Sequence, residues 1–272
     1  MINIPKNMSA VLTTSHGGFE VLDFRQDVEV PKPNSDQILI KVLAAGVNNT
    51  NINTRTAWYS KSVRGETGDG GAEGFDDAEN DDGSWSGTPL NFPIIQGADC
   101  CGEIVEVGDE VDRRRIGERV LVRTMQQHAV GYRPFECWTV GSECDGAFAQ
   151  YMVAFSDESY KIDSNWSDTE LGSISCAYST AENLLERSNV TKGEVVLITG
   201  ASGGVGSASI QLAKRRGAKV IGIASEDKIA GVESVGADVV IKRGERLSDV
   251  LGSECVDVVI DIVAGSRWGG FA

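Results

Sequence analysis

Residues 197–206, with the sequence LITGASGGVG, constrain the fold of this chain more than any other segment. The apolar run 195–198 is typical of a buried strand, and a glycine-rich turn follows it. Apolar side chains then recur at helical spacing, which predicts a helix over 204–216. A strand, a glycine turn and a helix in this order form a cradle for the phosphates of a dinucleotide, because backbone N–H groups and the positive end of the helix dipole face the ligand.

The turn supplies most of the cofactor-binding residues that we predict. They are Ala201, Ser202, Gly203, Gly204, Val205 and Gly206. Ala201 stands where the usual dinucleotide motif has its first glycine. The alternative is an ordinary tight turn between a strand and a helix, and the flanking pattern favours the cofactor site.

The end of the next strand indicates which dinucleotide the chain binds. An NAD site has an acidic residue there for the ribose hydroxyls. Here the strand 219–223 is followed by Ala224 and Ser225, with Lys228 close behind. A hydroxyl and an ammonium group suit a 2′-phosphate, so we predict NADP(H). Two alternatives stay open: Glu226 or Asp227 is the ribose acid of an NAD site, or Lys228 is an ordinary solvated lysine.

Composition is that of a globular two-domain enzyme. The chain has 272 residues, of which 41% are hydrophobic and 24% are charged. Its N-terminus has no signal-peptide pattern, and no apolar run is long enough to cross a bilayer, so we expect a cytoplasmic protein. In that compartment the six cysteines are expected to be reduced thiols.

An acidic segment dominates the charge of the chain. Residues 65–87 hold eight acidic residues, seven glycines and no lysine or arginine, which accounts for about half of the net charge of −15. This composition predicts a solvated loop, and its spacing does not match a calcium-binding loop. The negative charge disfavours nucleic acid and anionic membranes as partners. From its place in the sequence we advance the hypothesis that the loop covers the active site as a lid.

The predicted secondary structure changes in character near residue 168. Before it, strands are predicted at 37–42, 102–107, 117–122 and 147–153, typical of a β-rich domain such as a partly open barrel. After it, strands at 195–198, 219–223, 238–241 and 256–260 alternate with helices at 204–216 and 227–235. That alternation predicts an α/β fold with a doubly wound parallel sheet.

Five motifs occur in the same order as in a known enzyme family. They are residues 44–51 (AAGVNNTN), 96–102 (QGADCCG), 145–151 (DGAFAQY), 176–181 (CAYSTA) and the glycine turn. On these motifs the chain resembles the medium-chain dehydrogenase/reductase superfamily, which includes zinc alcohol dehydrogenases and zinc-free quinone oxidoreductases. The resemblance implies a GroES-like catalytic domain over 1–168, with an insertion at 65–87, and a Rossmann domain over 169–272.

The resemblance also tests for zinc. The positions of the family's zinc ligands hold Asn48, Ala98 and Cys176. A catalytic zinc needs three protein ligands, and one thiol cannot hold it. The family's run of four structural-zinc cysteines is missing, so we predict no metal and interpret Cys176 as a small apolar residue.

Hydride transfer without zinc suits a quinone or an α,β-unsaturated carbonyl, because neutral hydrogen-bond donors can stabilise an enolate oxygen. The resemblance places Asn48, Thr50 and Tyr178 as catalytic residues and Thr180 at the cofactor's carboxamide. Plainer alternatives are a turn former for Asn48, a cap for Thr50 and a core aromatic for Tyr178. Trp58 and Tyr59 line the substrate mouth or pack beneath the insertion.

The last residues are expected to leave this sheet short of the two final strands of the family, which commonly form a homodimer interface. A homodimer is therefore expected for a full-length form and is in doubt for this chain. Two alternatives to a quinone or enone reductase stay open. One is a truncated NADP-binding or sensor module or inactive fragment, and the other is an alcohol dehydrogenase.

Overall fold

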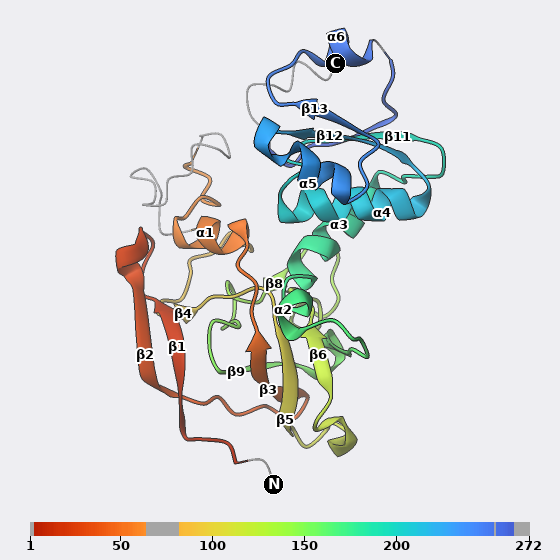
Figure 1. Ribbon diagram of the computed structural model, residues 1–272. Coiled ribbons are helices and arrows are strands. Elements are labelled where there is room, and N and C mark those ends of the chain that lie inside the picture. The colour runs from red at the N-terminus through yellow and green to blue at the C-terminus, as the bar shows by residue number, and fades with distance from the viewer. Residues whose placement is uncertain (1–2, 64–81, 253, 264–272) are drawn as a thin grey trace. The chain divides into compact units, whose positions relative to one another are not determined.

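The computed structural model describes residues 3–63, 82–252 and 254–263 (Figure 1). The described residues divide into two compact units, the first ending at Cys176 and the second beginning at Ala177. Most of the acidic segment 65–87 lies outside the described residues, and so does the hypothesis that it acts as a lid.

Antiparallel strands build the first unit. Its largest sheet has the order β10-β6-β5-β3-β9, with strands at Gln37–Ala44 (β3), Cys101–Val107 (β5), Arg119–Val122 (β6), Tyr151–Phe155 (β9) and Ser159–Lys161 (β10). A second sheet has the order β2-β1-β4, with strands at Asn7–Thr13 (β1), Leu22–Glu29 (β2) and Ile94–Ile95 (β4). A two-stranded sheet pairs Met125–Gln126 (β7) with Trp138–Thr139 (β8).

The large sheet is buried on both faces because its side chains alternate between two cores. On β3, Ile38 and Ile40 are fully buried in one hydrophobic cluster with Ile104 of β5. Leu39, between them, belongs to a second cluster that contains Met8 of β1. The sheet therefore lies between two apolar layers, and β1 packs against one of them.

Short helices connect these strands. The α-helices are Asn49–Arg55 (α1) and Asp168–Leu171 (α2), and the 3-10 helices are Phe19–Val21, Arg113–Arg115, His128–Val130 and Ser156–Glu158. Asn51, the third residue of α1, accepts a hydrogen bond from the backbone N–H of Asn48 through its side chain, at 2.8 Å. This bond fixes the start of α1 within the motif at 44–51, which begins at the end of β3.

The strand predicted at 147–153 was wrong at its start, because β9 begins at Tyr151. The backbone N–H groups of Ala147 and Phe148 bond to the carbonyl groups of Gly97 and Gln96 instead. Phe148 also accepts a backbone hydrogen bond from Val11 of β1. The preceding residues thus join two other segments before the chain enters the large sheet.

A parallel sheet forms the core of the second unit, in the order β13-β12-β11-β14. Its strands are Val195–Ile198 (β11), Lys219–Ala224 (β12), Val239–Lys242 (β13) and Val258–Ile260 (β14). The helices are Ser175–Arg187 (α3, of which the residues from Ala177 belong to this unit), Gly204–Arg216 (α4), Ile229–Ser234 (α5) and Leu247–Leu251 (α6), with a 3-10 helix at Glu226–Lys228. The predicted α/β class, parallel sheet and helix over 204–216 are confirmed.

Helices cover both faces of this sheet, as Figure 1 shows for α4 and α5 on one side and α6 on the other. Val196 and Ile198 of β11 pack with Ile210 of α4 in one buried cluster. Leu197, between them, faces the opposite way and packs with Leu247 of α6. Among the described residues, no helix combines the length and the apolar character needed to cross a membrane.

The pKa values of the two histidines of the chain are shifted in opposite directions. His128 lies between two carboxylates, with Nδ1 2.8 Å from Asp157 and Nε2 3.0 Å from Asp36, and the hydrogen bond to Asp157 raises its pKa. Burial lowers the pKa of His16, whose Nδ1 donates to the backbone carbonyl groups of Thr54 and Arg55. Folding therefore favours the charged form of His128 and the neutral form of His16.

We expect the substitution His128→Gln to destabilise the protein more at about pH 5.5 than at about pH 8.5, because stability from a raised histidine pKa is present at low pH and is lost as the pH rises through that pKa. His16→Gln is the control with the opposite sign, since its deficit should shrink at low pH. Thermal unfolding midpoints at the two pH values measure both trends. Parallel trends in the two variants would contradict this assignment.

Candidate active site

The glycine turn is shaped by close backbone contacts. Gly200, directly after Thr199, has a φ of +58°, a conformation that favours glycine. A Cβ atom at Gly206 would lie 2.2 Å from the carbonyl oxygen of Gly200, so only glycine fits there. Gly203 is the N-cap of α4, and its extended backbone turns the chain into the helix. The turn thus brings the N-terminus of a 13-residue helix to the carboxyl end of β11.

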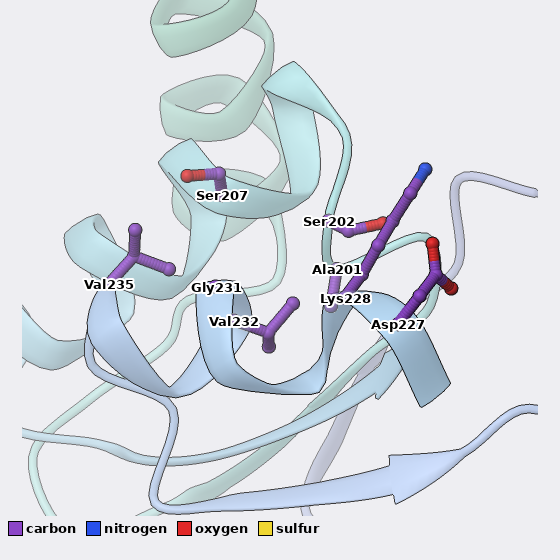
Figure 2. A pocket seen from close by; sticks show the side chains of 8 residues that line it. All are labelled: Ala201, Ser202, Ser207, Asp227, Lys228, Gly231, Val232 and Val235. Atoms are coloured by element: carbon purple, nitrogen blue, oxygen red, sulfur yellow. The ribbon is translucent and has the colours of Figure 1, made fainter. Parts of the chain in front are cut away.

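A pocket of about 340 Å³ lies beside this turn. Figure 2 shows Ser202, Asp227 and Lys228 on one side of the pocket, and Ser207 and Val235 on the other. The remaining lining residues are Ala201, Gly231 and Val232. Charged and polar groups at one end, and a valine and a serine at the other, suit the ribose and adenine of a nucleotide, and the N–H groups at the start of α4 suit its phosphates. The residues present therefore fit a dinucleotide cofactor.

Charges at the end of β12 bear on the choice of cofactor. A hydrogen bond from Ser225 and the nearby charges of Lys228 and Arg243 lower the pKa of Asp227. Of the two acids left open as ribose ligands, Asp227 lines the pocket, whereas Glu226 pairs with Lys242 at 2.5 Å. Sequence reasoning missed Arg243, which comes near only because β13 pairs with β12.

Helix α3 carries Tyr178 and Thr180. Its first residue in the second unit, Ala177, lies 3.5 Å from the position that a Cβ atom of Gly204 would take. The beginning of this segment therefore packs against the N-terminus of α4, one residue before Tyr178. Tyr178 is half-buried and Thr180 is exposed.

In the first unit, a buried carboxylate joins two of the predicted motifs. Asp99, 1% exposed, accepts a 2.8 Å hydrogen bond from Nδ2 of Asn48 and a 2.6 Å bond from the backbone N–H of Cys176. Burial raises the pKa of Asp99. Because a carboxylate only accepts, the first bond fixes which end of the Asn48 amide faces it. Asp99 lies within the motif at 96–102, but its hydrogen bonds to Asn48 and Cys176 could not be predicted from the sequence.

Thr50, the second residue of α1, has two aromatic partners. Its Oγ1 accepts hydrogen bonds from the hydroxyl of Tyr59 at 3.1 Å and from the indole N–H of Trp85 at 2.8 Å. The rings of Tyr59 and Trp85 lie 4.6 Å apart, and those of Trp58 and Tyr59 lie 5.5 Å apart. Sequence reasoning placed Tyr59 near the site but did not identify Trp85.

The residues at the family's zinc-ligand positions do not fit a zinc site. Ala98 has no donor atom, and the two oxygens of Asp99 already accept protein hydrogen bonds. Cys176 is the one thiol among the three positions, and burial, followed by the charge of Asp99, raises its pKa to about 12. Within residues 3–63, 82–252 and 254–263, no group of three or more His, Cys, Asp or Glu residues could hold a metal ion.

Two family models match the chain. The alcohol dehydrogenase GroES-like domain matches residues 34–164, and the zinc-binding dehydrogenase domain matches residues 204–268.

Curated relatives match along nearly the whole chain. It is 30% identical over 266 residues to the human quinone oxidoreductase, covering 95% of this chain and 67% of the relative. It is 28% identical over 264 residues to the chloroplastic NADPH-dependent alkenal/one oxidoreductase of Arabidopsis thaliana, covering 96% of this chain and 58% of the relative. The chain thus spans about two thirds or less of the length of these relatives.

Solved structures confirm the fold. A protein of Sinorhizobium meliloti 1021, described provisionally as an alcohol dehydrogenase, superposes with a TM-score of 0.84 at 38% identity, covering 98% of this chain and 72% of that one. The quinone oxidoreductase of Coxiella burnetii superposes with a TM-score of 0.72 at 29% identity, covering 96% and 70%.

The raised pKa of Asp99 leads to a prediction for stability. A carboxyl whose folded pKa is raised costs stability as the pH rises through that pKa, and Asp99→Asn removes this cost. We therefore expect the free energy of unfolding of the variant, relative to wild type, to improve as the pH rises from about 4 to about 7. Urea unfolding at the two pH values measures the difference.

Asp112→Asn is the matched control for this prediction. Hydrogen bonds from Arg114 lower the pKa of Asp112 to about 2. The free energy of unfolding of Asp112→Asn, relative to wild type, should therefore fall as the pH rises. A difference for Asp99→Asn that does not change with pH would show that burial does not control this carboxyl.

Proposed function

The chain belongs to the medium-chain dehydrogenase/reductase superfamily, and from this premise we propose that it is an NADPH-dependent oxidoreductase acting on a quinone or an α,β-unsaturated carbonyl without zinc. The superfamily is one of nicotinamide-dependent oxidoreductases that act on small molecules. The finer assignment to this cofactor and to these substrates is ours. Relatives named quinone oxidoreductase and alkenal/one oxidoreductase support it.

The observation that carries the proposal is the pair of hydrogen-bond donors at the start of α1. Each hydrogen of the Asn48 amide can donate, and the bonds found among the described residues use one of them, toward Asp99. Thr50 adds a hydroxyl two residues later. Neutral donors of this kind stabilise negative charge on a carbonyl oxygen, the charge that develops when the β carbon of an enone or quinone receives hydride.

In the proposal the second unit binds the cofactor and the first binds the substrate. The N–H groups at the start of α4 hold the pyrophosphate, and the pocket beside Lys228 holds the adenosine end. When bound, NADPH supplies the hydride. Asn48 and Thr50 hold the substrate carbonyl oxygen, Asp99 orients Asn48, and we assign Tyr178 to a contact with nicotinamide or substrate and Thr180 to the carboxamide.

A local excess of positive charge supports NADPH over NADH. Lys228 and Arg243 both act on Asp227, so the three side chains together carry a net positive charge at neutral pH. A 2′-phosphate would be attracted to this end of the pocket, whereas the two ribose hydroxyls of NADH need only the carboxylate.

We expect Lys228→Met to raise the dissociation constant for NADPH about tenfold, which corresponds to the loss of one charge-assisted hydrogen bond. The constant for NADH should change little, because that cofactor lacks the phosphate. Lys219→Met removes the same charge from the opposite end of β12 and is the matched control. Fluorescence titration measures all three proteins, and equal losses for the two cofactors would contradict the assignment of Lys228 to the 2′-phosphate.

The activity itself is tested by following NADPH absorbance with p-benzoquinone, cyclohexenone and a primary alcohol plus NADP⁺ as separate substrates. We expect turnover with the quinone or the enone, unchanged after dialysis against a chelator. Alcohol oxidation that zinc sustains would overturn the proposal in favour of an alcohol dehydrogenase. Tight NADPH binding without turnover would favour a binding or sensor module.

A further inference from the structure

Two side chains donate hydrogen bonds to the hydroxyl of Thr50 and leave it to act as a donor toward a ligand. A hydroxyl oxygen has two lone pairs and one hydrogen. The hydroxyl of Tyr59 donates to this oxygen, and so does the indole N–H of Trp85. With both lone pairs in use, the remaining hydrogen can only donate.

Both partners act as donors to Thr50 in the structure, and the indole can act in no other way. An indole N–H has no acceptor capacity. Burial raises the pKa of the Tyr59 phenol, although hydrogen bonds with Thr50 and Asn53 act against this shift, so the hydroxyl stays protonated and has a hydrogen to donate. The bond from Trp85 therefore cannot reverse and always occupies one lone pair of Thr50, whereas the direction of the bond from Tyr59 follows from the geometry of the two hydroxyls.

Backbone hydrogen bonds of residues 85–87 fix the position of Trp85. It lies in a turn in which the N–H of Gly87 bonds to the carbonyl of Ser84 at 3.1 Å. Its backbone N–H donates to Oγ of Ser142 at 3.3 Å, and the N–H of Ser86 donates to Glu143 at 2.8 Å. Trp85 is 39% exposed, so solvent reaches this side of the cluster.

We propose that Trp85 is a positioning residue that makes Thr50 a donor-only hydroxyl, so that this site binds carbonyl oxygens and cannot accept the proton of an alcohol. The inference rests on the proposed function, because it takes Thr50 as the residue that contacts substrate. It assigns a role to the described end of the acidic segment 65–87, which the family resemblance leaves out. It also excludes Thr50 as the base for an alcohol oxidation, since a hydroxyl whose two lone pairs are occupied cannot begin the deprotonation of an alcohol.

The test compares two ligands that differ only in their oxygen, cyclohexenone and cyclohexenol. Ligand-observed NMR titration in the presence of NADP⁺ gives both dissociation constants without any turnover. Wild type is expected to bind the ketone more tightly. In Trp85→Phe one lone pair of Thr50 becomes available and its hydrogen is free to rotate, so ketone binding should weaken and alcohol binding should improve.

We expect the ratio of the two constants to move about tenfold toward the alcohol in Trp85→Phe, about the effect of one hydrogen bond lost and one gained. The control is Trp138→Phe, which removes an indole of similar exposure, 37%, from β8 of the same unit. Tyr59→Phe breaks the other bond to Thr50 and should move the ratio in the same direction, which keeps the test available if Trp85→Phe does not fold.

Equal weakening of both ligands in Trp85→Phe would show that Trp85 only packs, and would overturn the inference. An unchanged ratio, or a wild type that binds neither ligand, would do the same. The proposed function fails separately: a protein that prefers the ketone but never reduces it with NADPH contradicts the function and leaves the hydrogen-bond assignment standing. Turnover of enone with an unchanged ratio in the variant contradicts only the role of Trp85.

Discussion

A buried carboxylate has to be surrounded by donors, and the candidate substrate site of the first unit is organised by that requirement. Asp99 is withdrawn from water, so each of its oxygens needs a protein partner to offset the lost solvation. The partners come from the start of α1 and the start of α3, through Asn48 and Cys176. Glycine stands at position 46 beside this carboxylate, where a Cβ atom would lie 2.5 Å from the carbonyl oxygen of Gly172 and 2.8 Å from an oxygen of Asp99.

The secondary structure of the second unit was largely predictable, because its strands and turns are encoded in short stretches of sequence. Parallel strands buried on both faces appear as continuous apolar runs, and glycines mark the points where a strand turns into a helix. Accordingly β11 and α4 begin and end at the residues predicted from the sequence. In the first unit the strand predicted at 147–153 starts late, because Ala147 and Phe148 bond to residues some fifty positions away, a distance that no local pattern records.

The same limit explains what the sequence could not reveal about the site. Asn48 and Thr50 were identifiable because they lie in one motif. Their hydrogen bonds to distant residues were not, because Asp99 is 51 residues from Asn48 and Trp85 is 35 residues from Thr50. A motif can thus indicate which residues face a ligand, whereas the protonation and orientation of those residues depend on long-range contacts that only the fold provides.

These contacts share one chemical consequence. Asp99 accepts from Asn48 and so directs the nitrogen of that amide inward, while Tyr59 and Trp85 donate to Thr50 and so fill its lone pairs. In the first case the partner is an acceptor and in the second the partners are donors, yet both arrangements leave a hydrogen as the group available to a ligand at α1. Such a site is complementary to an oxygen that gains negative charge, and it offers no base to an oxygen that must lose a proton. The polarity of these hydrogen bonds, more than the identity of any single residue, therefore supports the proposed reduction of a quinone or an α,β-unsaturated carbonyl.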